Sequence, residues 1–353
     1  MMKIAIITQP LISNYGGLLQ NWALQQALKK INLEWKVITF DQVDSVAPLY
    51  LRLGSRVKQM FGLKKRTNFL NSFELFRTTY INATTKAKSL RDFKRFDRLY
   101  KPDAYITGSD QVWRPRMTNI LSANFLGFTQ CPIKLAYAAS FGTDNWEFSE
   151  EETAISKRLI GQFKGISVRE DSGVTLCQTY LNKKAEHLLD PTLLLEPNDY
   201  KSLLAEEEIL TTPYIFTYIL DTSSEKQAIV KSIIGQEVEN NACYDANGHL
   251  PKVRMSVEQW IKGIIYSDLV VCDSFHGVAF SIIFNKDFIV LNNPERGNTR
   301  IESILRQFDL TDRLINCTRE NALVKPIDWE RINKRRKELK IKSINFIKAN
   351  LCQ

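Results

Sequence analysis

The sequence predicts an α/β protein built from two Rossmann-like domains that face each other across a cleft. Apolar, strand-like runs alternate with segments of helical length, which is typical of parallel α/β layers. The chain has 353 residues, more than one ordinary hydrophobic core requires, and this favours two domains. Hydrophobic residues make up 44% and charged residues 25% of the chain, the balance of a globular protein rather than a disordered one.

The first half of the chain begins with a βαβ pattern. We expect a buried strand over Lys3–Thr8, a helix over Leu18–Ile31 with apolar residues at helical spacing, and a strand over Trp35–Phe40. Residues 44–101 are basic and carry little strand signal, so we interpret them as helices or loops inserted into this domain. Further strands are expected at Asp103–Thr107, Lys134–Ala139 and Gly165–Val168. Each ends in small or charged residues, which predicts a polar rim along one edge of a sheet.

The first domain is expected to span residues 1–195, because a short strand within His187–Glu196 breaks into a linker at Asp190-Pro191. The second domain is placed at 196–325. Its expected strands are Tyr214–Leu220, Gln236–Glu239, Leu269–Cys272 and Phe288–Leu291, and its expected helices are Glu225–Ile234, Ser256–Tyr266 and Val278–Phe284. The pattern of residues 326–353 predicts a charged amphipathic helix that packs back against the first domain.

The chain is basic, with a formal net charge of +9 and a sequence pI of about 9.1. The excess lies in residues 52–66, 86–101 and 331–342. Such a balance suits acidic partners. The chain has no zinc finger, no RNP-like aromatic pattern and no helix-turn-helix, so nucleic acid is not expected. The basic segments are either solvated surface or a peripheral contact with an anionic membrane.

Six cysteines are scattered without a CxxC pair, which predicts buried reduced thiols rather than a zinc site or disulfides. No HExxH, DxD or paired histidines occur, so no metal and no bound cofactor are expected. No apolar run approaches the ~20 residues that span a bilayer. The apolar run Ile4–Thr8 is too short for a signal peptide. These features predict a cytoplasmic protein.

The segment Asp273–Gly277 is the strongest candidate for chemistry, because it lies between an apolar strand and a helix-like run. Ligands of open α/β sheets bind beyond the carboxyl ends of the strands, and a helix start offers N–H groups to an anion. His276 is one of three histidines and lies at this position. It is a candidate acid/base on an anionic substrate. The alternative is a capping or packing histidine.

Two loops of the first domain are candidate substrate contacts. The first holds Asn14, Tyr15, Gly16 and Gly17, and its paired glycines permit close approach of a ligand to the backbone. It is not a GxGxxG fingerprint, and a plain turn is the alternative. In the second loop, Ser109 and Asp110 could bind sugar hydroxyls and Trp113 could stack on a pyranose ring. The alternative is an aspartate that caps the next helix.

Two arginines are candidate ligands for a carboxylate or phosphate. Arg169 ends a predicted strand, and a structural salt bridge to Glu170, Asp171 or Asp190 is the alternative. Arg300 follows the strand Phe288–Leu291 by a short loop, with Arg296 as a competitor for the same role. 

Five motifs in order resemble the polysaccharide pyruvyl transferase family. They are NYGG (Asn14–Gly17), GSDQVW (Gly108–Trp113), SVREDS (Ser167–Ser172), LLDPTLLL (Leu188–Leu195) and DSFHG (Asp273–Gly277). The resemblance implies a GT-B-like fold and transfer of a pyruvyl group from the co-substrate phosphoenolpyruvate to a sugar. The implied acceptor is a sugar such as galactose in a surface or capsular polysaccharide precursor, free or lipid-linked, and the product is a pyruvate ketal. It also implies that Arg169 binds the donor and that His276 is the catalytic acid/base.

The last motif departs from the family pattern. Better-known members carry a donor-binding arginine two residues before the histidine, where this chain has Ser274. Either Arg300 supplies the missing charge, with Ser274 and Gly277 completing the donor site, or this branch uses another donor. Two other functions remain open: a GT-B glycosyltransferase that uses a nucleotide sugar, and a non-catalytic glycan-binding protein.

Overall fold

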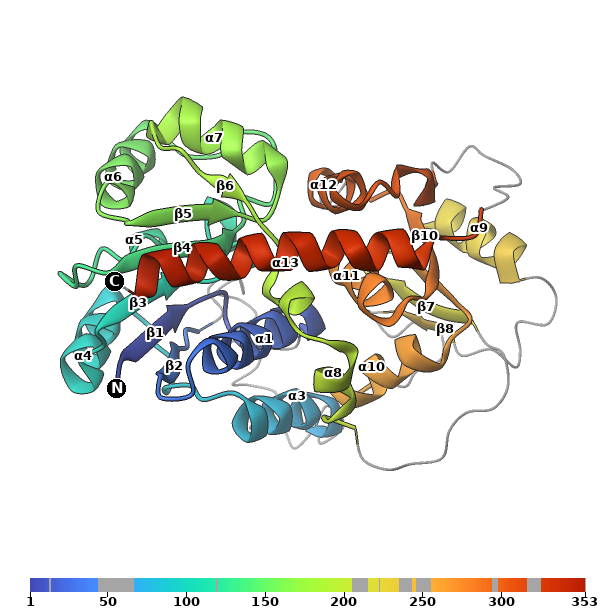
Figure 1. Cartoon of the computed structure of the whole chain (residues 1–353), viewed down its shortest axis with the longest axis horizontal. Helices are drawn as coiled ribbons and strands as arrows, with labels where there is room; N and C mark the ends of the chain where they lie inside the picture. The colour runs from blue at the N-terminus through green and yellow to red at the C-terminus, as the bar shows by residue number, and fades with distance from the viewer. Residues whose placement is uncertain are drawn as a thin grey trace, which may run out of the picture. The chain divides into compact units, whose positions relative to one another are not determined.

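The computed structural model divides the chain into two compact units, one of residues Met1–Leu194 with Ile341–Gln353 and the other of Leu195–Lys340. The structure describes residues 1–12, 14–43, 67–118, 120–204, 215–221, 223–234, 243–245, 255–293, 298–315 and 325–352. Each unit has a parallel β-sheet with helices packed around it (Figure 1). The predicted α/β class is confirmed.

The first unit contains a six-stranded sheet in the order β2-β1-β3-β4-β5-β6. Its strands are β1 (Lys3–Ile7), β2 (Lys36–Phe40), β3 (Ala104–Thr107), β4 (Lys134–Ala139), β5 (Gly165–Val168) and β6 (Glu186–His187). All pairs are parallel, with Ile4 beside Val37 on one side and beside Ala104 on the other. The chain adds β2 on one side of β1 and the later strands on the other. The switch point of this sheet is therefore between β1 and β3.

The described helices of the first unit are α1 (Tyr15–Ile31), α3 (Thr67–Tyr80), α4 (Leu90–Tyr100), α5 (Leu121–Asn124), α6 (Glu150–Ile160) and α7 (Asp171–Leu181), with short 3₁₀ turns η1 (Pro115–Met117) and η2 (Pro191–Leu194). Polar side chains cap α1, α4 and α6. Ser89 and Ser149 form capping boxes with Asp92 and Glu152 at the starts of α4 and α6. Helix α1 begins three residues earlier than predicted, because the side chain of Asn14 accepts the N–H of Gly17.

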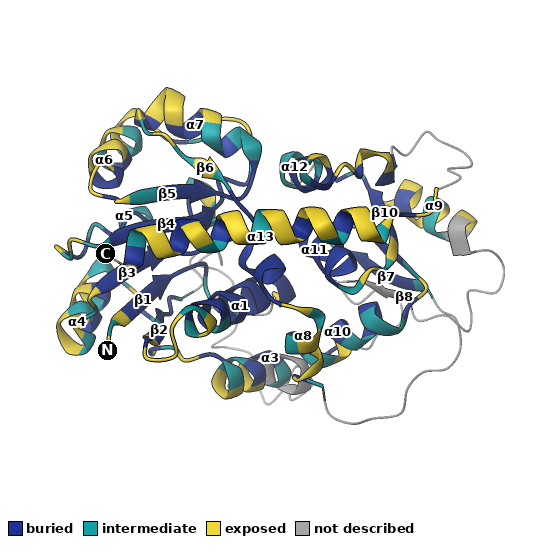
Figure 2. Ribbon diagram, in the orientation of Figure 1, coloured by how far each residue is buried: buried dark blue, intermediate teal, exposed yellow. Residues whose placement is uncertain are grey.

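Strands β1 to β5 of the first unit are largely buried on both faces, as parallel strands covered by helices must be, whereas the edge strand β6 is partly exposed (Figure 2). Ile4, Ile6 and Ile7 are fully buried. Aromatic rings fill the space between strands and helices, with Phe40 packed edge-on against Phe96 and Tyr105 at centroid distances of 5.5 and 5.9 Å. Burying one such side chain stabilises the fold by roughly 1.5–3 kcal/mol.

The second unit contains a five-stranded parallel sheet in the order β11-β10-β9-β7-β8. Its strands are β7 (Ile215–Ile219), β8 (Cys243–Asp245), β9 (Leu269–Cys272), β10 (Asp287–Leu291) and β11 (Leu314–Ile315). Its helices are α8 (Pro197–Lys201), α9 (Ser224–Ile234), α10 (Val257–Tyr266), α11 (Phe275–Phe284) and α12 (Thr299–Phe308), with the 3₁₀ turn η4 (Thr311–Arg313). The switch point of this sheet lies between β7 and β9. The strand predicted at 236–239 lies outside the described residues.

The last helix, α13 (Trp329–Leu351), carries residues of both units, because the division falls between Lys340 and Ile341. In the first unit, the hydroxyl of Ser343 accepts the backbone N–H of Leu189 at 3.2 Å. Asn350 lies so close to Gly165 that a side chain at that glycine would meet its amide at 2.5 Å. The end of the chain is thus part of the first unit's packing.

The prediction that the cysteines are buried holds for only some of them. Among the described thiols, Cys177 and Cys272 are buried, but Cys131 is half-buried and Cys352 is exposed; all four are free. Cys352 is exposed because it follows the last residue of α13, past the packed part of the helix. No helix in the described part of the chain has the length and apolarity to span a membrane.

Candidate active site

The predicted site residues fall at the carboxyl-terminal edge of each sheet, in segments that follow the strands. In open α/β sheets this edge, at the switch point of strand order, is where ligands bind. In the second unit the switch point lies between β7 and β9, and α11 begins directly after β9. In the first unit it lies between β1 and β3, which lead to α1 and to the loop that begins at Gly108.

His276 is the second residue of α11. The helix begins three residues earlier than predicted, because Ser274 caps it: the Ser274 hydroxyl accepts the N–H of Gly277 at 3.0 Å. His276 is 8% exposed, and its ring packs edge-on against Phe275 at a centroid distance of 5.2 Å. The imidazole therefore lies in the first turn of a ten-residue helix, beside the positive end of its dipole.

Gly277 is needed for packing. A Cβ atom at this position would lie 2.7 Å from the Sγ of Cys272 and 2.8 Å from its Cβ. Only a glycine lets the first turn of α11 lie this close to the end of β9. The contacts of Ser274 and Gly277 in this structure are therefore with the turn itself.

Asp273 connects the turns that follow three strands. It is 1% exposed, and its carboxylate accepts hydrogen bonds from the N–H of Leu220 after β7 at 2.6 Å and from the amide of Asn293 after β10 at 2.9 Å. The ammonium group of Lys226, on α9, donates to the same carboxylate at 2.7 Å. The sequence did not predict this role of Lys226, because a lysine near the start of a helix is usually exposed to solvent.

Arg300 is the second residue of α12 and is half-buried. Helix α12 follows β10, which lies beside β9 in parallel register, and α12 packs against α11. His276 and Arg300 therefore both lie in the first turns of helices that begin at one edge of one sheet. Arg296, the competing candidate for the role of Arg300, lies outside the described residues.

Arg169 follows β5 and lies among three carboxylates. Its guanidinium is 3.2 Å from Asp190, 3.5 Å from Asp110 and 4.0 Å from Glu170, and its side chain is 1% exposed. Burial alone would lower the pKa of the guanidinium, but the carboxylates outweigh it and raise this pKa. The structure shows the ion pairs of the salt-bridge alternative for Arg169, while its donor-binding role stays a prediction.

The same cluster ties together the strand ends of the first unit. Asp190 accepts from the Ser109 hydroxyl at 2.7 Å, and Glu170 accepts from the Ser140 hydroxyl at 2.9 Å. The Nε2 of His187 lies 3.0 Å from the carbonyl oxygen of Arg169, and burial lowers the pKa of this imidazole. The polar rim is therefore a buried hydrogen-bonded network. Asp190 was expected in a linker and is instead a central member of it.

One predicted sugar contact of the first unit needs correction. Trp113 is fully buried, stacks on Phe125 at 5.1 Å and donates its indole N–H to the carbonyl of Asn124 at 3.3 Å. It is a core residue, and it follows Asp110, whose φ of 74° lies in the left-handed region. The carboxylate of Asp110 accepts the N–H of Gln111 at 2.9 Å and is 8% exposed.

The NYGG segment is the first turn of α1 rather than a loop. Asn14 is exposed, the ring of Tyr15 packs on Phe73 at 4.9 Å, and Gly16 and Gly17 are buried inside the helix. A Cβ atom at Gly17 would meet only the Asn14 side chain, at an ordinary 3.4 Å. Helices α1 and α11 thus begin alike, with a polar cap, an aromatic residue, one further residue and a glycine.

The family model for polysaccharide pyruvyl transferases matches residues 14–295. The chain belongs to the polysaccharide pyruvyl transferase family. Membership implies a transferase that moves a group from a small-molecule donor to a saccharide acceptor. No curated protein matches the sequence significantly.

Solved structures share the fold of this pyruvyl transferase family member. The S. aureus MnaA-UDP co-structure is 11% identical, with a TM-score of 0.53 over 98% of this chain and 91% of that chain. The N-terminal domain of Candida albicans trehalose-6-phosphate phosphatase is 10% identical, with a TM-score of 0.50 over 100% of this chain and 97% of that one. These likenesses confirm the predicted GT-B-like fold.

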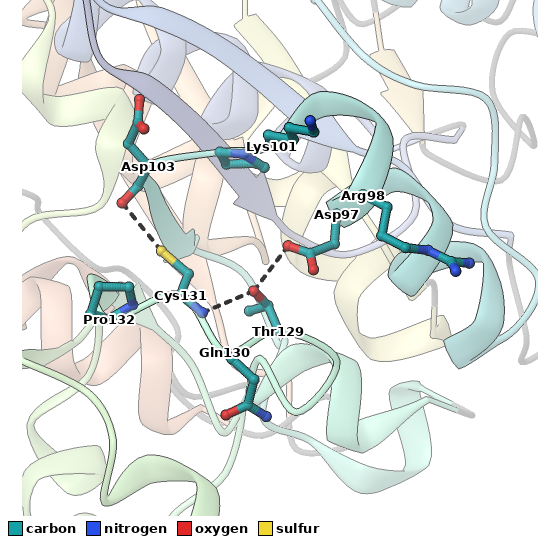
Figure 3. Close-up of a pocket in the computed structure, with 9 residues that line it drawn as sticks. Asp97, Arg98, Lys101, Asp103, Thr129, Gln130, Cys131 and Pro132 are labelled. Carbon is teal, nitrogen blue, oxygen red and sulfur yellow. Dashed lines mark hydrogen bonds between the residues drawn. The ribbon is translucent and has the colours of Figure 1, made fainter.

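An open recess of about 640 Å³ in this family member lies away from the candidate site, at the amino-terminal edge of the first sheet. It is lined by Asp97, Arg98, Lys101, Pro102, Asp103 and residues 129–132 (Figure 3). The Cys131 thiol there donates to the carbonyl of Asp103 at 3.2 Å, and burial raises its pKa. The recess contains none of the predicted site residues.

Proposed function

We propose that this member of the family transfers a pyruvyl group from phosphoenolpyruvate to a saccharide and forms a cyclic pyruvate ketal. Family membership supports a transferase with a saccharide acceptor. The observation that carries the proposal is the position of His276 in the first turn of α11, after β9 at the switch point of its sheet. An imidazole beside N–H donors suits proton transfer on an anionic substrate.

The reaction balances without a cofactor. One acceptor hydroxyl adds to C2 of phosphoenolpyruvate while a proton reaches C3, so the double bond becomes a methyl-bearing tetrahedral carbon. A second hydroxyl of the same sugar then forms its bond to that carbon, and the bond to the phosphate oxygen breaks. Inorganic phosphate leaves with the proton of the second hydroxyl, and the product is the ketal.

We assign the proton delivery to His276, a role typically worth about 10²–10⁴-fold in rate. The donor carries a carboxylate and a phosphate, so it needs cationic groups or N–H groups. Arg300 in the first turn of α12 and the start of α11 are the groups we assign to it. Arg300 takes the place of the arginine that Ser274 replaces.

We propose a sugar of a surface or capsular polysaccharide precursor as the acceptor, with galactose as the first candidate. Asn14, exposed at the cap of α1, is the contact of the NYGG segment that faces solvent. A lipid-linked precursor would bring this protein to the cytoplasmic face of a membrane.

The direct test is release of inorganic phosphate from phosphoenolpyruvate with galactose-, mannose- and glucosamine-containing acceptors. Phosphate release that depends on one acceptor, with a ketal methyl signal in the NMR spectrum of the product, is the expected result. Release of a nucleoside diphosphate from a nucleotide sugar would instead identify a glycosyltransferase. Saccharide binding without turnover of either donor would identify a binding protein.

A further inference from the structure

Helix α4 carries a one-sided row of cations. Arg91, Lys94, Arg95 and Arg98 follow the spacing i, i+3, i+4 and i+7, which places them on one face of a helix, and Lys101 at the carboxyl-terminal cap continues the row. We call these five residues the α4 cationic face. All five are exposed, and exposed residues line the outer side of α4 (Figure 2).

The acidic residues of α4 do not neutralise this face. The carboxylate of Asp92 accepts the N–H groups of Lys88 and Ser89 at the helix start, and its coulombic interaction with Arg95 is weaker than these hydrogen bonds. Asp97 points inward, to the hydroxyls of Tyr105 and Thr129 at 2.6 and 2.9 Å. Figure 3 shows the side chain of Arg98 extending away from that carboxylate. None of the five cations forms an ion pair with a described carboxylate.

The aromatic residues of α4 are buried or half-buried, and the guanidinium of Arg95 lies 5.6 Å from the ring centroid of Phe96. Phe93 and Phe96 are buried in the first unit's core, where Phe93 stacks on Phe128. The face therefore has no exposed aromatic ring on which a nucleobase could stack, a usual component of single-strand recognition. It does have an exposed apolar side chain at its border, Leu99, which is 68% exposed. Cations bordered by an apolar side chain are typical of helices that lie at a lipid interface.

We propose that the α4 cationic face docks on the surface of a membrane rich in anionic phospholipid. Charge complementarity carries the choice of partner: five cations without ion pairs face a surface of phosphate groups, and Leu99 reaches toward the acyl boundary. The proposal explains how the enzyme would meet a lipid-linked acceptor, and for that purpose it rests on the proposed function. The docking itself needs neither donor nor acceptor.

The test is co-sedimentation of the full chain with vesicles of phosphatidylcholine alone or mixed with phosphatidylglycerol. The triple variant Arg91→Gln/Lys94→Gln/Arg98→Gln should bind the mixed vesicles about 100-fold more weakly than the wild type, because each cation near such a surface contributes about a factor of five. The control Lys334→Gln/Lys337→Gln/Lys348→Gln removes the same charge from exposed positions of α13 and should bind like the wild type. Matching thermal melts would show that both variants fold.

A second variant tests the apolar contact. Leu99→Ser keeps every charge and should weaken binding to the mixed vesicles several-fold, while added salt should weaken binding of the wild type. The proposal is overturned if the wild type ignores anionic lipid, if both triple variants lose binding equally, or if duplex or single-stranded DNA outcompetes the vesicles. Vesicle binding is measured independently of phosphate release. A failure of the membrane proposal would therefore not contradict the proposed reaction, and a failure of the proposed reaction would not contradict membrane binding.

Discussion

The ammonium group of Lys226 donates a hydrogen bond to the carboxylate of Asp273 at 2.7 Å, and both side chains are almost entirely buried. Removing one partner of a buried ion pair leaves the other charge uncompensated. Asp273→Asn should therefore lower the free energy of unfolding by about 3–5 kcal/mol, measured by urea denaturation. It should also loosen the turns after β7, β9 and β10, which Asp273 joins.

An exposed ion pair of the same unit provides the control. Arg331 and Asp309 are 2.6 Å apart, with side chains 50% and 82% exposed. Asp309→Asn should cost at most about 1 kcal/mol. Equal losses from the two aspartate variants would contradict the view that Asp273 organises a buried network.

Arg169 and Arg300 should respond differently to substitution by glutamine. Arg169→Gln leaves Asp110, Glu170 and Asp190 without their cation and should lower the unfolding free energy by about 3–5 kcal/mol. Arg300→Gln should raise the KM for phosphoenolpyruvate by about 10- to 100-fold, the loss of a charge-assisted hydrogen bond. It should lower stability less than Arg169→Gln does, because Arg300 is only half-buried whereas Arg169 is fully buried. If the KM for phosphoenolpyruvate rises in Arg169→Gln but not in Arg300→Gln, the donor arginine is Arg169 and our assignment is wrong.

The two glycines that follow helix caps provide a matched pair. Gly277→Ala places a methyl group 2.7 Å from Cys272 Sγ and should cost about 1–3 kcal/mol. Gly17→Ala meets only ordinary contacts and should keep or raise stability, by up to about 1 kcal/mol, because alanine favours the helix. Thermal denaturation of the two variants measures the difference. A loss of stability at both positions would show that strain in the helix, and not the contact with β9, requires the glycine.

His187 should make stability depend on pH. Burial lowers its pKa from 6.5, so below pH 6.5 the unfolded chain binds a proton that the folded chain does not. The stability contributed by the neutral ring is complete above pH 6.5 and is lost as pH falls toward the lowered pKa. His187→Gln should show a smaller loss of unfolding free energy over this acidic interval than the wild type. Parallel curves for the two proteins would refute the assignment.

His276→Gln should lower acceptor-dependent phosphate release by about 10²–10⁴-fold, because the variant side chain cannot transfer a proton. His187→Gln is the matched control: it changes the other described histidine, in the first unit, and should retain turnover at neutral pH. Undiminished phosphate release by the position-276 variant would remove the acid/base role from our proposal.

The strands were largely predictable from sequence because apolar runs such as Leu269–Cys272 are bounded by polar or helix-breaking residues. Helix starts were placed too late, at Leu18 and Val278, because caps such as Ser274 were interpreted as loop residues. The structure is needed to see that Trp113 is in the core. An aromatic residue in a polar motif does not reveal which way the chain turns, and here Trp113 follows the left-handed Asp110.

The candidate site was partly predictable. The strand–turn–helix pattern predicted a site at His276, and this residue does lie in the first turn of α11 at the switch point of its sheet. Its catalytic role stays a prediction. The partners of Asp273 could not be found, because Lys226 and Asn293 come from segments distant in sequence. For Arg169, Glu170 and Asp190 were foreseen as partners, whereas Asp110 was not. Only pairing of the strands brings such residues within hydrogen-bonding distance.

The place of Ser343 beside Leu189 has a consequence for biogenesis. The first unit is completed by the final turns of α13, so it cannot finish folding on the ribosome when its own sheet has emerged. It must wait, partly open, until translation has passed through the whole second unit. Loss of residues 341–353 would therefore damage the packing of a unit whose other residues lie at the opposite end of this sequence.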